Sequence, residues 1–294
     1  MNFNEIYNKH YKKLFIIPIL LVILAFLFIG NHYNKTGDFI NKDVSLKGGV
    51  TATISTSQIV PDLESFLQSN FPESDLSVRT LSEFGTSEQI GILIEITNID
   101  DKILQSLLEE KLGFDLNQDN FSLEIVGSSL GNSFYKQMLV AILLAFLFMA
   151  LVVLITFRTF IPSIAVVFAA FSDIIITIAI LDLIGLKLST AGIAALLMLI
   201  GYSIDTDVLL TTKVLKGKNI GSVTERLING AKTGLTMTIT TLVAVTIGYI
   251  VTTSSILKEM FLIIIIGLLV DIISTYCMNA GLLVWYARRK NGKV

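Results

Sequence analysis

Residues 137–157 read QMLVAILLAFLFMALVVLITF, a run without a single charged side chain. About 20 mostly apolar residues are enough to cross the roughly 30 Å hydrocarbon core of a bilayer, so this run predicts a membrane-spanning helix. The whole composition agrees, because 53% of the 294 residues are hydrophobic and only 16% are charged. Soluble domains carry about 25% charged residues, so an ordinary soluble globule is excluded.

Five further runs are long and apolar enough to span a bilayer, so the sequence predicts six membrane helices. The first is interpreted as a retained anchor, since no small-residue cleavage site follows it. The chain then divides into 1–30 (N-terminus and first helix), 31–136 (a polar domain), 137–287 (five helices) and 288–294 (a tail). The predicted spans are Leu14–Gly30, Gln137–Phe157, Pro162–Ile184, Ser189–Val214, Lys232–Thr253 and about Lys258–Tyr286.

Basic residues flank alternate loops, and cytoplasmic loops of membrane proteins carry an excess of Lys and Arg. If these loops are cytoplasmic, both termini lie inside the cell and residues 31–136 lie outside. We therefore expect a multi-pass protein of the cytoplasmic (plasma) membrane. The flanking cations are Lys9, Lys12, Lys13, Arg158, Lys213, Lys216, Lys218, Arg226, Lys232, Arg288, Arg289 and Lys290.

The polar domain alternates between strand patterns and helix patterns. Their order, strand–helix–strand–strand–helix–strand, is that of a ferredoxin-like split unit. The predicted fold class is thus a polytopic α-helical membrane protein with six transmembrane helices and an external α+β ferredoxin-like domain between helices 1 and 2. Strands are expected at Val50–Ser55, Leu76–Leu81, Ile90–Thr97 and Phe121–Val126, helices at Pro61–Ser69 and after Asp100, and a linker at Gly127–Asn132.

Four carboxylates lie well inside the predicted spans, away from the span ends: Asp173, Asp205, Asp207 and Asp271. A charged Asp at a helix centre costs about 2.5–3.5 kcal/mol, so intramembrane carboxylates indicate function. Residues two apart on a helix point about 200° away from one another, so Asp205 and Asp207 cannot face the same partner. We expect Asp205 to be the titrating group of a proton relay, and Asp207 to face the cytoplasmic mouth.

Lys232 opens the fifth span and is either a counter-charge for this relay or an ordinary snorkelling lysine. Alternatively, the carboxylates only hydrogen-bond neighbouring helices, with threonines of the fifth span as donors.

No motif for covalent, phosphate or metal chemistry occurs in the sequence. Gly48-Gly49 lacks the Gly-Lys-Ser/Thr of a phosphate-binding loop, and no nucleophile elbow is present. The two histidines, His10 and His32, and the one cysteine, Cys277, have no metal-ligand neighbours. We therefore expect no enzymatic activity, no cofactor, no metal and no nucleic acid.

Several motifs resemble those of the SecF family of protein-export membrane subunits. The run Gly201-Tyr202-Ser203-Ile204-Asp205-Thr206-Asp207 is similar to the family's fourth-span motif. Residues 43–49, from Asp43 to Gly48-Gly49, resemble a segment after the first span of SecD and SecF. The resemblance covers roughly 131–287 plus 43–49 and includes Phe157-Arg158, Pro162, Ser163, Ser172-Asp173, Lys232-Thr233 and Thr238-Ile239-Thr240-Thr241-Leu242.

The resemblance implies an auxiliary subunit of the Sec machinery, which pairs with SecD beside the protein-conducting channel and promotes translocation of a polypeptide across the cytoplasmic membrane. It also implies the resistance-nodulation-division superfamily, whose members commonly run on proton or ion gradients. The bacterial pattern has Asn-Asp where this chain has Asp205-Thr206, and tends to have Arg where Lys232 stands. These departures suggest an archaeal-type SecF.

Four alternatives stay open. SecD itself is the nearest, although its external domain is usually larger. A small-molecule or lipid exporter subunit of the same superfamily would normally repeat this half within one chain. An intramembrane aspartyl protease would need Tyr-Asp and Gly-x-Gly-Asp signatures, which Ser172-Asp173 and Ile204-Asp205 do not match. A passive scaffold for the partner is the fourth.

Overall fold

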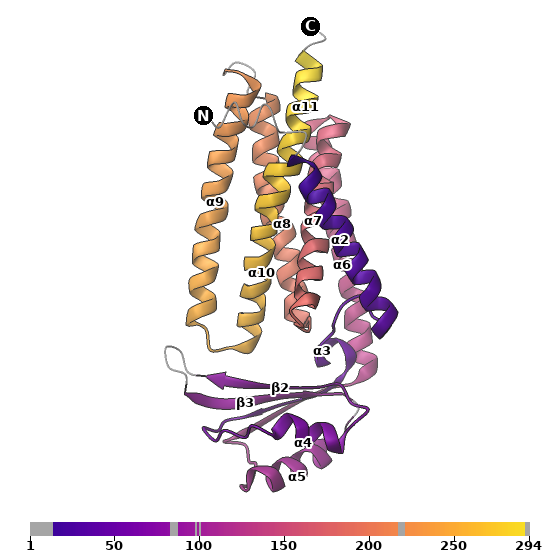
Figure 1. The fold of residues 1–294 in the computed structure, drawn as a ribbon, viewed down its shortest axis with the longest axis vertical. Helices are drawn as coiled ribbons and strands as arrows, with labels where there is room; N and C mark the ends of the chain where they lie inside the picture. The colour runs from indigo at the N-terminus through magenta and orange to yellow at the C-terminus, as the bar shows by residue number, and fades with distance from the viewer. Residues whose placement is uncertain (1–13, 83–87, 98, 100, 217–220, 292–294) are drawn as a thin grey trace.

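The computed structural model describes residues 14–82, 88–97, 99, 101–216 and 221–291. A long helical bundle stands on one face of a small sheet, and two short helices cover the other face (Figure 1). Helix α2 begins, and the C-terminal helix α11 ends, at the end of the bundle away from the sheet. The bundle comprises α2 Ile16–Thr36, α6 Ser128–Phe157, α7 Phe160–Leu183, α8 Thr190–Lys216, α9 Val223–Val251, α10 Ser255–Ile273, the π-helical segment η1 Ser274–Asn279 and α11 Ala280–Asn291.

Five of the described helices are long and apolar enough to cross a membrane: α2, α6, α7, α8 and α9. The sixth predicted span corresponds to α10, η1 and α11, which follow one another without a loop. Helix α10 carries Lys258, Glu259 and Asp271, and η1 interrupts the α-helix directly after it. The chain is thus mostly helical with five clear candidate spans, and the sixth stays a prediction.

The sheet has four strands in the order β2-β3-β1-β4, and all neighbours are antiparallel. With one helix after β1 and another after β3, this is the arrangement of a ferredoxin-like split unit. Alternate residues of β1 are buried against the two helices, as period-two side-chain alternation requires. The elements are β1 Gly49–Ile54, α4 Leu63–Asn70, β2 Leu76–Ser82, β3 Gln89–Ile96, α5 Asp101–Leu112 and β4 Phe121–Val126.

Two features of the junction between sheet and bundle differ from the sequence analysis. The expected linker Gly127–Asn132 is not a linker, because α6 begins at Ser128 and only Gly127 separates it from β4. A further short helix, α3 Val44–Lys47, precedes β1 and packs against α6. The expected helix cap Asp100 lies outside the described residues.

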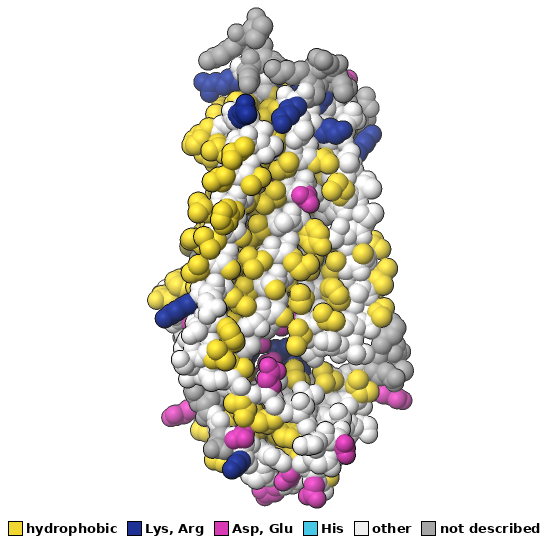
Figure 2. Space-filling view, turned by 180° about the vertical axis from the view of Figure 1, so that it is seen from behind, with side chains coloured by type: hydrophobic (Ala, Val, Ile, Leu, Met, Phe, Trp, Pro, Cys, Tyr) yellow, Lys and Arg dark blue, Asp and Glu magenta, His cyan; other side chains and the backbone are white. Residues whose placement is uncertain are grey.

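The two ends of the molecule differ in charge. Lys and Arg side chains gather at the end of the bundle away from the sheet, whereas Asp and Glu side chains gather around the sheet (Figure 2). Apolar side chains cover the surface between these ends. This distribution is what the excess of cations in cytoplasmic loops would produce if the sheet lay outside the cell.

Candidate functional site: a buried carboxylate cluster and the junction above it

Three of the four intramembrane carboxylates meet inside the bundle. Asp173 of α7, Asp207 of α8 and Asp271 of α10 are each 0% exposed. Asp271 lies close enough to interact electrostatically with both Asp173 and Asp207. Three helices thus deliver carboxylates to one buried site, which we call the carboxylate cluster (Asp173, Asp207 and Asp271).

Hydroxyl and amide donors hold each member of the carboxylate cluster in place. Ser203 Oγ donates to Asp173 Oδ2 at 2.6 Å, and Ser274 Oγ donates to Asp173 Oδ1. Asn279 Nδ2 donates to Asp207 Oδ1 at 2.7 Å.

One hydroxyl links two members of the cluster. Thr275 Oγ1 lies 2.9 Å from Asp207 Oδ1 and 3.1 Å from Asp271 Oδ1. A hydroxyl carries a single proton, so Thr275 can donate to only one of these carboxylates at a time. Thr206 Oγ1 lies 3.3 Å from the other oxygen of Asp271.

The π-helical segment η1 supplies three of these donors: Ser274, Thr275 and Asn279. All three are 0% exposed, in the middle of the run that would form a sixth span. Single-turn π segments inside helices are frequent at functional sites. Sequence reasoning missed these donors, although polar residues inside an apolar run are the signal that could have found them.

Some buried polar atoms of the helices that carry the cluster have no hydrogen-bond partner among the described residues. They include Asp207 Oδ2 and Asn279 Oδ1, together with the hydroxyls of Thr177 and Thr211. Buried polar groups without partners are costly, and three carboxylates cannot all stay charged in a dry bundle. The arrangement can therefore hold protons and pass them between neighbouring carboxylates.

Asp205 is not a member of the cluster, contrary to the sequence analysis. It is exposed on the surface of α8, whereas Asp207 is fully buried. The two side chains point in different directions, as the rotation of about 200° between them predicts, but the expectation that Asp205 is the interior residue was wrong. The buried face of α8 contains Leu199, Ser203 and Leu210, and helical spacing places Asp207 on that face. We therefore give the interior position to Asp207.

The fifth predicted span contributes less than expected. Lys232 is exposed and makes no ion pair with any described residue. The hydroxyls of Thr240 and Thr241 donate to carbonyls of their own helix, as does that of Thr236. These threonines are therefore not the donors to the carboxylates.

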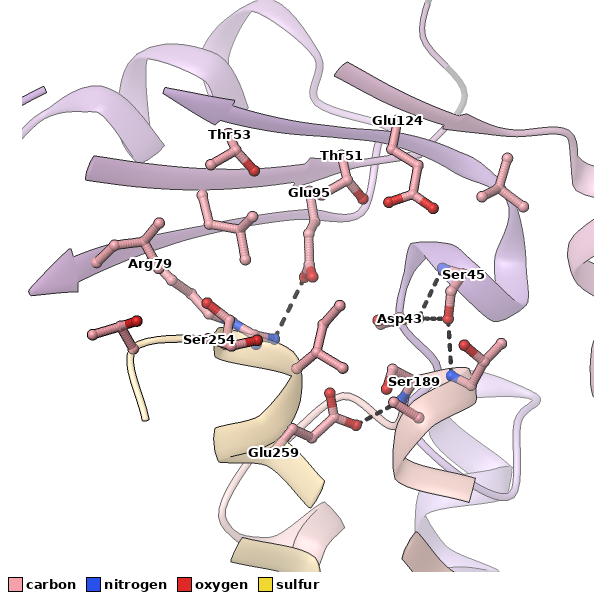
Figure 3. A pocket seen from close by; sticks show the side chains of 18 residues that line it. Asp43, Ser45, Thr51, Thr53, Arg79, Glu95, Glu124, Ser189, Ser254 and Glu259 are labelled. Atoms are coloured by element: carbon pink, nitrogen blue, oxygen red, sulfur yellow. Dashed lines mark hydrogen bonds and ion pairs between the residues drawn. The ribbon is translucent and has the colours of Figure 1, made fainter. Parts of the chain in front are cut away.

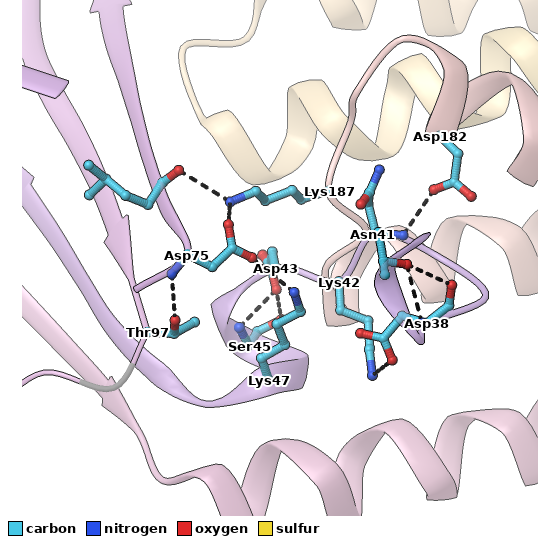
Figure 4. Close-up of polar contacts among 12 residues, drawn as sticks. Asp38, Asn41, Lys42, Asp43, Ser45, Lys47, Asp75, Thr97, Asp182 and Lys187 are labelled. Carbon is cyan, nitrogen blue, oxygen red and sulfur yellow. Dashed lines mark hydrogen bonds and ion pairs between the residues drawn. The ribbon is translucent and has the colours of Figure 1, made fainter. Parts of the chain in front are cut away.

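The motif residues near α3 form a second site, where the sheet meets the bundle (Figure 4). Asp43 caps α3 by accepting from the Ser45 amide at 2.8 Å, and its own amide donates to the Leu188 carbonyl at 3.1 Å. Ser45 Oγ accepts from the amide of Thr190, the first residue of α8, at 3.0 Å. The motif thus attaches the segment before β1 to the start of α8.

Two glycines of this motif allow a close backbone approach. Gly48 has φ +87° and Gly49 has φ +151°, a region that residues with a Cβ rarely adopt. A Cβ on Gly48 would lie 2.6 Å from the Ser128 amide nitrogen at the start of α6. The Gly-Gly pair therefore lets the backbone pack closely against its neighbours, which include the start of α6.

Ion pairs reinforce the junction. Asp75, just before β2, bridges Lys187 at 2.7 Å and Lys47 at 2.9 Å. Burial alone would raise the pKa of Asp75, but the hydrogen bonds from Lys187 and Lys47 outweigh it and lower that pKa. Lys187 lies between α7 and α8, so these pairs connect the sheet to the loop that leads into α8.

A polar cavity of about 340 Å³ lies between the sheet and the ends of the helices (Figure 3). Its walls include Glu95 of β3, Arg79 of β2 and Glu259 of α10. Glu259 accepts from the Ser189 amide at 2.9 Å, while Arg79 lies 3.4 Å from Glu95. Burial raises the pKa of Glu95 despite the nearby Arg79.

The family model for the C-terminal region of the SecD/SecF protein-export membrane proteins matches residues 108–289. The chain belongs to the SecF family. A SecF from Methanolacinia petrolearia is 37% identical, over 96% of this chain and 95% of its own length. A SecF from Pyrococcus furiosus is 36% identical, over 96% and 93%.

A solved structure has the same fold as this SecF family member. The crystal structure of SecDF from Thermus thermophilus, described as a translocon-associated membrane protein, superimposes with a TM-score of 0.78 at 20% identity. The match covers 98% of this chain but 39% of the SecDF chain.

The other motif residues lie on α8 and at the end of α6. Gly201 and Tyr202 are exposed and Ser203 is buried, while Arg158 is exposed and directly follows α6.

Proposed function

We propose that this chain is an auxiliary subunit of the Sec protein-export machinery, which pairs with a SecD-like subunit and promotes translocation of polypeptides across the cytoplasmic membrane. The family assignment and the curated SecF relatives support this function over the full length of the chain. The protein-conducting channel, the translocating polypeptide and membrane lipid are the further partners.

The exposed position of Asp205 on α8 is the main argument for a SecD-like partner. Asp205 is exposed within α8, on a helix long and apolar enough to span the membrane. A carboxylate at this position would face hydrocarbon in an isolated subunit, at a cost of about 2.5–3.5 kcal/mol. Gly201 and Tyr202 are exposed on the same helix, and a Cβ on Gly201 would meet nothing within 4 Å. A second membrane protein that covers this face removes the cost.

The proposal includes a topology. α10, η1 and α11 together cross the membrane as a sixth span, both termini are cytoplasmic, and the ferredoxin-like domain is external. The cations at the end of the bundle away from the sheet support this orientation (Figure 2).

The proposal also includes coupling to the proton gradient. Asp207 is the central titrating group. Asp271 exchanges protons with it through the Thr275 hydroxyl, which lies within hydrogen-bond distance of both carboxylates, and Asp173 interacts electrostatically with Asp271. A change in packing at Asp207 would move α8, whose first residue is hydrogen-bonded to the Asp43–Gly49 segment. One proton that crosses 100 mV supplies about 2.3 kcal/mol, more than one typical intramolecular hydrogen bond contributes.

Reconstituted vesicles test both parts. They contain the channel, a SecD-like subunit and this chain, and export is measured with and without a proton gradient. Asp207→Asn keeps the size but cannot titrate, so we expect assembly and basal export to persist and the gradient-dependent stimulation to disappear. Asp205→Asn should retain the gradient dependence, because Asp205 lies outside the cluster. Full gradient dependence in Asp207→Asn would leave a passive scaffold as the better description.

A further inference from the structure

An apolar groove runs between α6 and α7 on the surface of the bundle. Its volume is about 430 Å³, within the range of about 300–1,000 Å³ that is typical of small-molecule sites. The walls are almost entirely apolar and include four phenylalanines. The groove is lined by Phe146, Ala150, Leu154, Phe160, Ser163, Ile164, Val167, Phe168 and Phe171.

One end of the groove carries positive charge. Arg158 lies between the lining residues Leu154 and Phe160 in the chain, is exposed, and forms no ion pair with any residue in the described part of the chain. Lys216, at the end of α8, has its Nζ 5.8 Å from the centre of the Phe157 ring, a buried ring that does not line the groove. An apolar groove with an exposed arginine in the turn between its two helices fits an amphiphile with a negative head.

The start of α7 adds hydrogen-bond donors at this end. Thr159 is the N-cap residue, but its side chain makes no capping hydrogen bond, and its buried Oγ1 has no hydrogen-bond partner in the described part of the chain. The third helical residue is Pro162, which has no N–H for such a cap to bind. The first amides of α7 thus stay open, and helix N-termini with open amides favour anions.

The groove differs from a surface on which another membrane helix would pack. Such surfaces use small residues that let the backbones approach, but here only Ala150 and Ser163 are small. Helix α9 instead presents Gly230 and Gly234 to its neighbours, with contacts to Leu210 and Tyr276. Figure 1 places α6 and α9 at opposite edges of the bundle, so the groove is remote from α9.

We propose that this groove binds an anionic membrane phospholipid, with one hydrocarbon chain between α6 and α7 and the phosphate against Arg158 and the N-terminus of α7. The phenylalanine walls exclude water along the chain, and the head remains at the bilayer interface. The bound lipid fills a gap that no helix of the described chain covers, and it fixes the turn between the second and third spans.

Native mass spectrometry of the detergent-purified chain, titrated with phosphatidylglycerol or phosphatidylcholine, tests the site. Wild type should retain one phosphatidylglycerol more tightly than phosphatidylcholine. Arg158→Gln should weaken phosphatidylglycerol binding about fivefold, because one cation near the surface contributes about 1 kcal/mol. Ala150→Phe fills the groove and should remove the bound lipid of either type.

Matched controls separate this site from general effects. Lys213→Gln removes another exposed cation at the same end, and Leu147→Phe enlarges an exposed residue of α6 outside the groove. Both should bind lipid like wild type. Equal loss in Lys213→Gln or Leu147→Phe would overturn the proposal, as would retention in Ala150→Phe. A photo-crosslinker at Ile164 that captures a protein helix in native membranes would also refute it. All four variants should still copurify with the SecD-like subunit, which distinguishes this test from that of the export function.

Discussion

Gly48→Ala should loosen the junction between the sheet and the bundle. The residue has φ 87° and ψ 147°, close to a region that only glycine adopts readily, and such strain costs about 1–3 kcal/mol. The added Cβ would also lie 2.6 Å from the Ser128 nitrogen and 2.9 Å from the Gly127 carbonyl carbon. Both neighbours are backbone atoms, so the chain must shift, at a further cost of about 1–3 kcal/mol.

Gly113→Ala is the matched control. Gly113 also has a positive φ of 77°, but a Cβ there meets no atom within 4 Å. We expect a cost of about 1–2 kcal/mol, confined to the end of α5. The difference between the two variants isolates the close approach of Gly48 to the start of α6.

Hydrogen exchange of the purified full chain, followed by mass spectrometry, measures this difference. A loss of about 2 kcal/mol or more would speed exchange in α3 and the first turn of α6 by about 30-fold or more, at 1.4 kcal/mol per factor of ten. Gly113→Ala should leave those amides unchanged. Wild-type exchange at the junction in Gly48→Ala would refute the packing role of the motif.

Three further predictions concern topology, pH and helix packing. With the native cysteine replaced, Asp119→Cys should react with an impermeant thiol reagent on intact cells and Lys213→Cys should not; the reverse pattern contradicts the orientation. The melting temperature of the domain that contains the sheet should rise as the pH falls to about 4.5, because burial raises the pKa of Glu95 and protonation relieves the buried charge. The melting temperature should then decrease again at pH values below about 3.8, because Asp75, whose pKa is lowered, becomes protonated there and loses its ion pairs. A melting temperature that does not change with pH would contradict this. Gly267→Val should destabilise the purified chain by about 1–3 kcal/mol or more in thermal unfolding, since its Cβ would lie 2.6 Å from Leu199 Cδ1, and wild-type stability would exclude that contact.

The spans could be predicted from the sequence because a helix that crosses the hydrocarbon core needs a long run of apolar residues. Five of them appear as helices of sufficient length, and α7 and α8 match their predicted bounds within two residues. The four strands of the sheet were equally predictable, since burial of every second residue produces an alternating sequence pattern. Helices α6 and α9 begin well before their predicted starts, because their first turns are polar and lie beyond the apolar run.

The site was harder to predict. Composition identified the intramembrane carboxylates, but only the direction in which α8 faces could decide between Asp205 and Asp207. Tertiary packing sets that direction. The donors of η1 and the ion pairs of Asp75 join segments far apart in the sequence, such as Asp75 and Lys187, and no local pattern reports such contacts.

The central claim is that a SecD-like subunit covers the exposed face of α8. A photo-crosslinking amino acid at Tyr202, beside Asp205, tests it in native membranes, with the same amino acid at Leu147 of α6 as the control. We predict that the adduct at Tyr202 contains a SecD-like protein, identified by mass spectrometry, and that Leu147 yields none. Adducts of Tyr202 with lipid alone, or with a second copy of this chain alone, would contradict the account.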